Sequence, residues 1–163
     1  FENESFSKSF QSEFGIEILK KIGIKIAYNF LDVYKNINGH KHRLPFISKH
    51  HLLNTYSYRP PESNWNIDVN IHWFGRKKLQ NTEQNPIQYQ RPNYSSPYSM
   101  VNMQITREFS NYDIYLGCEN LFDFKQENPI IAADDPFGDF FNISNIWGPT
   151  RGREIYLGLR LTL

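Results

Sequence analysis

The sequence predicts an all-β fold, a segment of a transmembrane antiparallel β-barrel with about seven strands. Three observations predict this class. Apolar and polar residues alternate with period two along several segments of about ten residues, which is the length that a tilted strand needs to cross a bilayer. Short and long connections follow one another strictly along the chain. No apolar run reaches the roughly 18 to 20 residues of a membrane-spanning helix.

The first two predicted strands, residues 13–19 and 24–30, form a hairpin around a turn at residues 21–23. In both strands, bulky apolar residues occupy every second position, so that one face is apolar. Residues 1–12 are expected to be a surface loop or the end of a preceding strand.

The third predicted strand lies near residues 49–59. Leu52 and Leu53 are adjacent, so the pattern leaves open which face of this strand is apolar. Pro60 and Pro61 cannot donate to a strand ladder and predict a tight turn that ends the strand.

The fourth strand, residues 65–73, has the clearest alternation in the chain. One face is wholly apolar and the other wholly polar, which indicates an apolar environment on one side and water on the other. Trp65 and Trp73 bracket the apolar face, as the two aromatic girdles of a membrane barrel require. The apolar face consists of Trp65, Ile67, Val69, Ile71 and Trp73, and the polar face of Asn66, Asp68, Asn70 and His72.

The last three predicted strands cover residues 99–109, 114–122 and 154–163 and show the same alternation. A short turn at residues 110–113 joins the first two of them. The chain therefore ends on an amphipathic strand, with Leu163 as its last residue.

The connections predict the polarity of the sheet. Those at residues 21–23, 60–64 and 110–113 are short, and the alternate ones are long and rich in Asn, Pro, Gly and His. In an antiparallel meander every other connection lies at the same end, so one end carries tight turns and the other extended loops. Outer-membrane barrels have this polarity, with short periplasmic turns and long extracellular loops. The long connections are residues 34–48, 75–97 and 123–152.

Two alternatives remain open at this stage. A soluble β-rich binding module would also alternate, although its strands are usually nearer 5 to 6 residues and connections beyond about 12 to 15 residues are uncommon. Seven strands would leave two unpaired edges in lipid, which a bilayer does not tolerate. We therefore expect the chain to be part of a larger barrel. A small stand-alone outer-membrane barrel would need an eighth strand from residues 1–12.

Composition excludes several other classes of protein. Aromatic residues make up 16% of the chain, which argues against disorder. The net charge of +1 gives no support for nucleic-acid binding. Cys118 is the single cysteine, so neither an intrachain disulfide nor a thiolate metal cluster can form.

Several C-terminal motifs together resemble the end of TonB-dependent outer-membrane receptors. They are residues 114–123 (IYLGCENLFD), 128–138 (NPIIAADDPFG), 146–149 (IWGP) and 152–160 (GREIYLGLR). The insertion with Pro-Ile-Ile and Trp-Gly-Pro looks most like receptors of the Bacteroidetes type. Upstream, residues 14–17 and 44–50 are similar to strand and loop patterns of such receptors.

The resemblance implies a 22-stranded barrel, of which residues 13–163 would supply the last seven strands. It also implies an N-terminal plug domain and a TonB box, neither of which is visible in this chain. The implied function is outer-membrane active transport of a scarce nutrient, such as an iron-siderophore, haem, cobalamin or an oligomer, energised through TonB. The implied partners are outer-membrane lipid and lipopolysaccharide, the rest of the barrel, the plug, TonB and a small-molecule substrate.

The candidate ligand-binding residues lie in the long connection at residues 75–97. Arginine and tyrosine together suit the recognition of carboxylate, phosphate or sugar through bidentate hydrogen bonds and ring stacking. The alternative is a basic rim that meets lipopolysaccharide phosphates or only keeps the loop solvated. The candidates are Tyr89, Arg91, Asn93 and Tyr94, with Arg76, Lys77 and Lys78 nearby.

Metal and catalytic sites find less support. Histidine is a common metal ligand, but no acidic residue or cysteine completes an obvious set around the histidine cluster, so solvated loop positions are the better interpretation. The acidic cluster lacks the spacing of a calcium loop. Because no catalytic motif occurs, we expect no enzyme and no cofactor. The histidines are His40, His42, His50 and His51, and the acidic residues are Asp134, Asp135 and Asp139.

Overall fold

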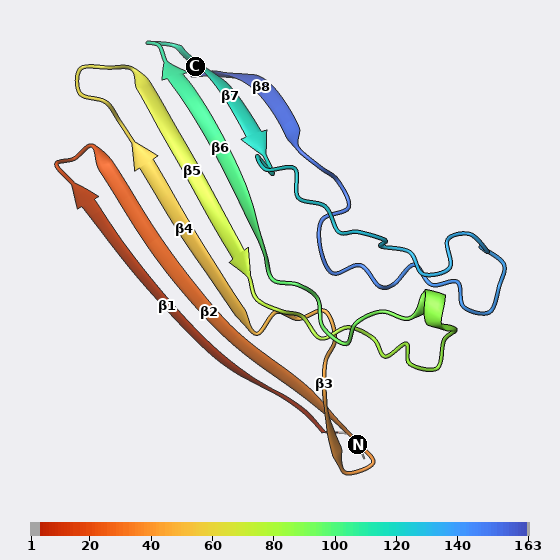
Figure 1. Cartoon of the computed structure of the whole chain (residues 1–163). Helices are drawn as coiled ribbons and strands as arrows, with labels where there is room; N and C mark the ends of the chain where they lie inside the picture. Colours follow the sequence, from red (N-terminus) through yellow and green to blue (C-terminus); the bar gives the residue numbers. More distant parts are fainter. Residues whose placement is uncertain (1–3, 163) are drawn as a thin grey trace.

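The computed structural model describes residues 4–162, which form one antiparallel sheet (Figure 1). All seven predicted strands are present, and a short eighth pairs with the second, so the order is β1-β2-β4-β5-β6-β7-β8 with β3 beside β2. No helix in this described part is long and apolar enough to cross a membrane. The elements are β1 (Ser5–Ile18), β2 (Ile22–Ile37), β3 (His40–Arg43), β4 (His50–Tyr58), β5 (Trp65–Phe74), the 3-10 helix η1 (Ile87–Tyr89), β6 (Tyr98–Glu108), β7 (Tyr112–Glu119) and β8 (Glu154–Leu161).

The strand register sorts side chains onto two faces. Residues directly opposite in an antiparallel pair lie on the same face of the sheet. Val69 lies opposite Tyr56 on β4 and Met103 on β6, whereas Asn70 lies opposite Thr55 and Asn102. The predicted alternation of β5 therefore continues across its neighbours as an apolar face and a polar face.

The register also settles the orientation of β4, which the sequence left open. Leu52 lies opposite Trp73 and belongs to the apolar face, whereas Leu53 lies opposite His72 and belongs to the polar face. Thr55 and Ser57, which share the face of Leu53, donate side-chain hydrogen bonds to Asn70 and Asp68 on β5. A polar network thus follows the polar face.

The first hairpin is longer than predicted, and its turn lies elsewhere. β1 begins at Ser5 rather than near residue 13, because Phe6 and Phe10 continue the face of Phe14 with polar residues between them. The turn covers residues 19–21 rather than 21–23, since Ile18 pairs directly with Ile22. Leu163, expected to end the last strand, lies outside the described residues.

The predicted long loop at residues 34–48 was wrong in part, because most of it continues the sheet. β2 runs to Ile37 and turns back into β3 through Asn38 and Gly39, which have φ values of 52° and 77°. Two successive residues with positive φ match the right-handed twist of the flanking strands, which is why Asn-Gly favours tight hairpins. Much of the connection between β2 and β4 is therefore an extension of the sheet, formed by the end of β2 and by β3, at the end where the long loops lie.

The other two long loops extend from that same end (Figure 1). We name them the 75–97 loop, between β5 and β6, and the 120–153 loop, between β7 and β8. The alternation of short and long connections therefore places both long loops together, as predicted. Few apolar side chains are buried, and they are Leu79, Tyr98, Val101, Ile131 and Ala132, mostly at this end of the sheet.

Two tyrosine rings cover two glycines at the β7–β8 pair. Gly117 lies opposite Tyr156, and Gly158 lies opposite Tyr115. A Cβ atom added at Gly117 would overlap the Tyr156 ring. The Tyr156 hydroxyl also donates a hydrogen bond of 3.1 Å to Gln104 on β6. The absence of a side chain at Gly117 therefore lets one tyrosine tie three strands together.

We expect Gly117→Val to destabilise the folded protein by about 1–3 kcal/mol, because the new side chain must displace the Tyr156 ring. Urea unfolding of the folded protein measures the change. Gly15→Val is the matched control, since the nearest atom to a Cβ at Gly15 is the Ile24 carbonyl oxygen at 4.0 Å. Equal unfolding midpoints for the two variants would contradict this account of the tyrosine.

Candidate functional site between the long loops

The 75–97 and 120–153 loops pack against one another and form the candidate site. The Tyr89 hydroxyl, in η1, donates a hydrogen bond of 2.9 Å to Asp134, and its ring lies 6.2 Å from the ring of Phe140. Farther along, Asn142 donates to the side chain of Gln80 at 3.4 Å. The two loops, which the β6–β7 hairpin separates in sequence, thus form one polar interface.

Each loop is also organised internally. In the 75–97 loop, an antiparallel bridge joins Lys78 and Tyr94, and the amide of Leu79 donates to the carbonyl of Asn93 at 2.9 Å. In the 120–153 loop, an antiparallel bridge joins Ile131 and Asn142. Both loops are therefore narrow folded-back segments rather than open coils.

The buried amide of Gln126 holds the second half of the 120–153 loop in place. Its Nε2 donates to the carbonyl of Asn145 at 2.8 Å. Its Oε1 accepts from the amides of Trp147 at 2.7 Å and Gly148 at 3.0 Å. Gln126 is only 5% exposed, so loss of its side chain would leave these backbone groups without partners away from water.

A cavity of about 240 Å³ lies between the two loops. Two buried polar atoms in its lining have no hydrogen-bond partner, namely Nε of Arg91 and Oδ1 of Asn145. One is a donor and the other an acceptor, and buried groups of this kind normally find a partner in protein, water or ligand. The lining also includes Tyr94, Gln126 and Trp147. The cavity therefore offers charge, hydrogen bonding and aromatic surface to a small polar ligand.

A row of stacked rings on the polar face lies at the base of the loops. His51, Phe74, Tyr98 and Phe124 follow one another with centroid distances of 4.4, 4.9 and 4.8 Å. Lys77 lies above this row, 5.4 Å from the Phe74 centroid and 5.2 Å from that of Tyr98. The row joins β4, β5, β6 and the 120–153 loop.

Lys77 connects this aromatic row to the 120–153 loop. Its ammonium donates to the Trp147 carbonyl at 2.6 Å and to the Tyr98 hydroxyl at 3.1 Å. Burial lowers the pKa of the Lys77 ammonium. Lys77 was expected to be one of several basic residues of the loop, whereas these hydrogen bonds fix its side chain within the fold.

The four predicted ligand-binding residues do not form one cluster. Arg91 and Tyr94 both line the cavity, and Arg91 also donates to the Ile130 carbonyl at 3.5 Å. Tyr89 instead joins the two loops through Asp134, and this hydrogen bond raises the pKa of its hydroxyl. Asn93 is exposed and donates to Glu83 at 3.4 Å.

The residues that the second loop brings to the cavity were not predicted from the sequence. Gln126, Asn145 and Trp147 belong to no recognisable binding motif, and they come together only because the 120–153 loop folds back on itself. The Trp-Gly-Pro segment was the one available signal. It carries the tryptophan and the glycine whose amides Gln126 binds.

The histidine and acidic clusters are divided among different parts of the fold. His40 and His42 lie on β3, whereas His50 bonds the Tyr28 hydroxyl on β2 at 2.7 Å, and His51 lies 3.4 Å from His72 on β5. Across residues 4–162, no three His, Cys, Asp or Glu side chains are placed to hold a metal ion together. In the acidic cluster of Asp134, Asp135 and Asp139, the Asp134 carboxylate accepts the hydrogen bond of the Tyr89 hydroxyl.

The sheet of this chain is similar in fold to parts of solved receptor structures. No protein-family model and no curated protein matches the sequence, but solved structures do. The ferric-catecholate import receptor Fiu from E. coli, in its closed form, is 12% identical over 98% of this chain, with a TM-score of 0.66. A mutant of the ferric enterobactin receptor PfeA from Pseudomonas aeruginosa, in complex with enterobactin, is 14% identical over 91%, with a TM-score of 0.59.

The antiparallel sheet of this chain has the fold of part of these structures. Another PfeA mutant from Pseudomonas aeruginosa agrees, with 13% identity over 91% of this chain and a TM-score of 0.58. Fiu is described as a ferric-catecholate import receptor and PfeA as a ferric enterobactin receptor. The chain spans 21% of the length of each of them.

We expect Gln126→Met to open the 120–153 loop, because a side chain of similar size leaves two amides and one carbonyl unpaired, at about 1–3 kcal/mol for each buried group. Hydrogen–deuterium exchange should accelerate at Trp147 and Gly148 by tenfold or more. Gln84→Met, at an exposed position of the other loop, is the control and should leave exchange unchanged. Unaltered protection in the Gln126 variant would show that this amide does not hold the loop.

Proposed function

We propose that this chain supplies the C-terminal barrel wall and surface loops of an outer-membrane receptor that imports a scarce nutrient with energy delivered through TonB. The observation that carries the proposal is the combination of a sheet similar to that of solved receptors, with one continuous apolar face, and a polar cavity between its long loops. The proposal includes energy transfer through TonB, the plug domain and the other partners, none of which is part of the sheet described above.

The apolar face supports a position in the membrane. Its side chains are far more exposed than those of a soluble sheet, with Phe14 at 62% and Leu157 at 74%. Trp65 and Trp73 lie at the two ends of β5 on this face, at the levels where aromatic girdles meet the two interfaces. In this position the apolar face would contact lipid, and the polar face would contact the water inside the barrel.

The open edges support a larger barrel. Within the described residues, β1 pairs only with β2, and β8 pairs only with β7. A sheet edge in lipid leaves backbone donors and acceptors unpaired at several kcal/mol each, so both edges need further strands. We infer that the remainder of a barrel of 22 strands closes these edges around a plug domain. The Pro-Ile-Ile and Trp-Gly-Pro insertion supports a receptor of the Bacteroidetes type.

The cavity supports a small polar or anionic substrate. Arg91 supplies a fixed cation, Asn145 an unpartnered amide oxygen, and Trp147 an aromatic surface. Among iron-siderophores, haem, cobalamin and oligomers, we place an iron-siderophore first, because Fiu is described as a ferric-catecholate import receptor and PfeA as a ferric enterobactin receptor. We propose that Arg91 and Tyr94 contact the substrate in the cavity, and that Tyr89 and Asn93 contact it from other positions on the 75–97 loop.

The two faces of β5 should respond differently to an added charge. Val69→Arg places a cation at mid-membrane and should cost about 2–4 kcal/mol, whereas Asn70→Arg points into a wet lumen and should cost less than about 1 kcal/mol. The measurement is the yield of heat-modifiable receptor in the outer-membrane fraction. Equal yields would refute the face assignment and favour a soluble β-rich module.

Substrate uptake should depend on the 75–97 loop. Changing Tyr89, Arg91 and Tyr94 together to Ala should lower binding of the transported ligand by at least tenfold, because aromatic and arginine anchors dominate binding energy. The assay is growth and binding with ferric siderophores, haem, cobalamin and glycans in cells that carry the full receptor.

Two comparisons sharpen this test. Arg91→Ala alone isolates the cavity between the loops, because Arg91 lines no other described cavity, and Gln88→Ala controls for any change in the exposed loop surface. Wild-type binding by the triple variant, at normal receptor abundance, would remove the loop assignment while leaving the receptor assignment in place.

A further inference from the structure

Two histidines meet on the polar face of the sheet, close to the end where the long loops lie. His51 lies near the start of β4, and His72 lies near the end of β5. Both side chains are half-buried, and His72 Nδ1 lies 3.4 Å from His51 Nε2. The two rings lie within 16° of parallel, with centroids 5.6 Å apart. One of the facing nitrogens therefore donates its N–H to the lone pair of the other.

A methionine lies beside this histidine pair. Met100 on β6 is directly opposite His72, so it belongs to the same face of the sheet. Opposite residues have Cβ atoms about 4.5–5.5 Å apart, and the three rotatable bonds of methionine let its sulfur reach across that gap. Met100 is half-buried as well. The register thus brings two imidazoles and one thioether together from three neighbouring strands.

The distance between the two ring nitrogens suits a metal ion. A change of tautomer moves the proton between the rings to the far nitrogen of its own imidazole, which leaves a lone pair on each facing atom. With metal–imidazole bonds of about 2.0–2.1 Å, nitrogens 3.4 Å apart subtend an angle of about 110° at the metal. That angle is close to the tetrahedral value, so the two nitrogens have the spacing of a bidentate ligand pair.

Charge and donor type favour a soft monovalent ion. All three donors are uncharged, and thioether sulfur is a ligand that selects Cu(I). Lys77 adds a fixed positive charge nearby, since its ammonium lies 5.4 Å from the centroid of the Phe74 ring, which itself lies 4.4 Å from that of His51. Repulsion from this ammonium is twice as large for a divalent ion as for a monovalent one. Zn²⁺ and Cu²⁺ are therefore disfavoured relative to Cu(I).

We propose that His51, His72 and Met100 bind one Cu(I) ion on the polar face of the sheet. The thioether completes a ligand set for which residues 4–162 supply no third His, Cys, Asp or Glu side chain. A cavity of about 230 Å³, lined by His51, Asn29 and Lys77, gives the ion a path to the site. The site depends on the register of β4, β5 and β6, so it goes beyond the proposed function and does not rest on it.

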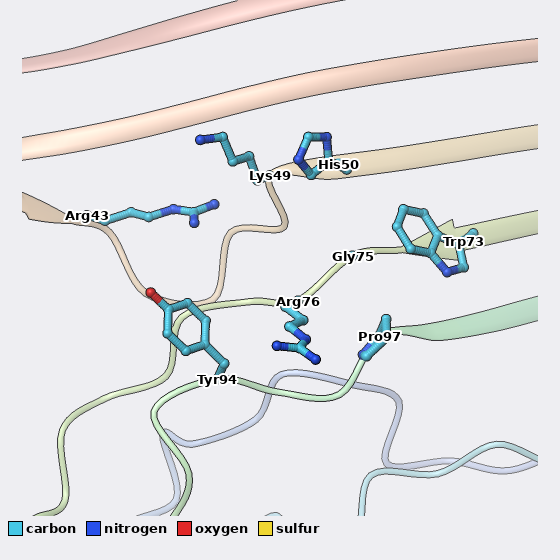
Figure 2. Close-up of a pocket in the computed structure, with 8 residues that line it drawn as sticks. All are labelled: Arg43, Lys49, His50, Trp73, Gly75, Arg76, Tyr94 and Pro97. Carbon is cyan, nitrogen blue, oxygen red and sulfur yellow. The ribbon is translucent and has the colours of Figure 1, made fainter.

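The neighbouring His50 is not part of this site. It lies opposite Phe30 on the apolar face, and it lines a second cavity, of about 420 Å³, together with Trp73 (Figure 2). Its Nδ1 already shares a hydrogen bond of 2.7 Å with the Tyr28 hydroxyl. Successive residues of a strand point to opposite faces, so only His51 of the two adjacent histidines belongs to the copper site.

The test is a titration of the full receptor in detergent with Cu(I), kept reduced by ascorbate without oxygen, against the chelator bicinchoninate. Met100→Leu, which conserves side-chain volume, should lower the affinity for Cu(I) at least tenfold, because even an outer-shell partner of a metal ligand is typically worth ten- to hundredfold. His72→Gln should lower it at least as much. Met103→Leu is the matched control, because Met103 lies on the same strand and faces the apolar side, opposite Val69.

X-ray absorption at the copper edge gives a second readout, which the wild type alone provides. Its spectrum should show two nitrogen neighbours and one sulfur neighbour. Equal Cu(I) affinity of the Met100 and Met103 variants, a wild-type spectrum without sulfur, or an affinity for Zn²⁺ equal to that for Cu(I) would each overturn the proposal. A receptor that binds Cu(I) at this site but imports no nutrient would instead remove the proposed function alone, which separates the two conclusions.

Discussion

A single antiparallel sheet cannot bury its apolar face within itself, and the rest of this structure depends on that constraint. In a two-layer protein, the apolar face of a sheet packs on a second layer. Here the buried apolar residues lie mostly at the loop end, and side chains such as Leu157 on β8 and Phe14 on β1 stay exposed. The strand register keeps those side chains on one face, so the apolar surroundings must come from outside the sheet.

The same constraint divides the two ends of the sheet. At the turn end, short connections join β1 to β2, β4 to β5 and β6 to β7. These turns are too short to need internal packing. At the loop end, the 75–97 and 120–153 loops leave the sheet and must satisfy their own backbone groups. Gln126 and Lys77 do this with buried side-chain hydrogen bonds that reach across tens of residues. The loops are thereby rigid enough to enclose a cavity, which open coils could not do.

Period-two alternation was sufficient to predict the strands because it depends only on which face meets apolar surroundings. It located β5 almost to the residue and failed where polar residues interrupt an apolar face, as Lys8 and Ser12 do between the phenylalanines of β1. The alternation could not decide whether Leu52 or Leu53 lies on the apolar face, because two adjacent leucines fit either orientation of the strand. Only the pairing of β4 with β5 decides this. The Asn-Gly turn before β3 was a local signal that the loop-length argument overlooked.

The candidate site was harder to predict because its parts come from distant segments. Arg91 and Tyr94 could be selected by residue type, since arginine and tyrosine are common binding groups. Asn145 could not, because an asparagine gains importance only when its amide oxygen is buried without a partner. The same limit applies to a second cavity at the loop end of the sheet, which Arg43 and Arg76 both line although β4 and β5 separate them in sequence. Residue type indicated the chemistry, but the sheet register determined which residues could act together.

Tyr94 lines the cavity between the loops and also a second cavity, which reaches Trp73 at the end of β5. Its backbone is bridged to Lys78, next to the Lys77 that reaches Trp147, so the residue is held by the same contacts that shape the cavity between the loops. A substitution at Tyr94 therefore alters both cavities, whereas Arg91 and Arg76 each line one. The rigidity of a loop at a binding site lowers the entropy lost on binding, and here that rigidity would come from the contacts of the fold itself.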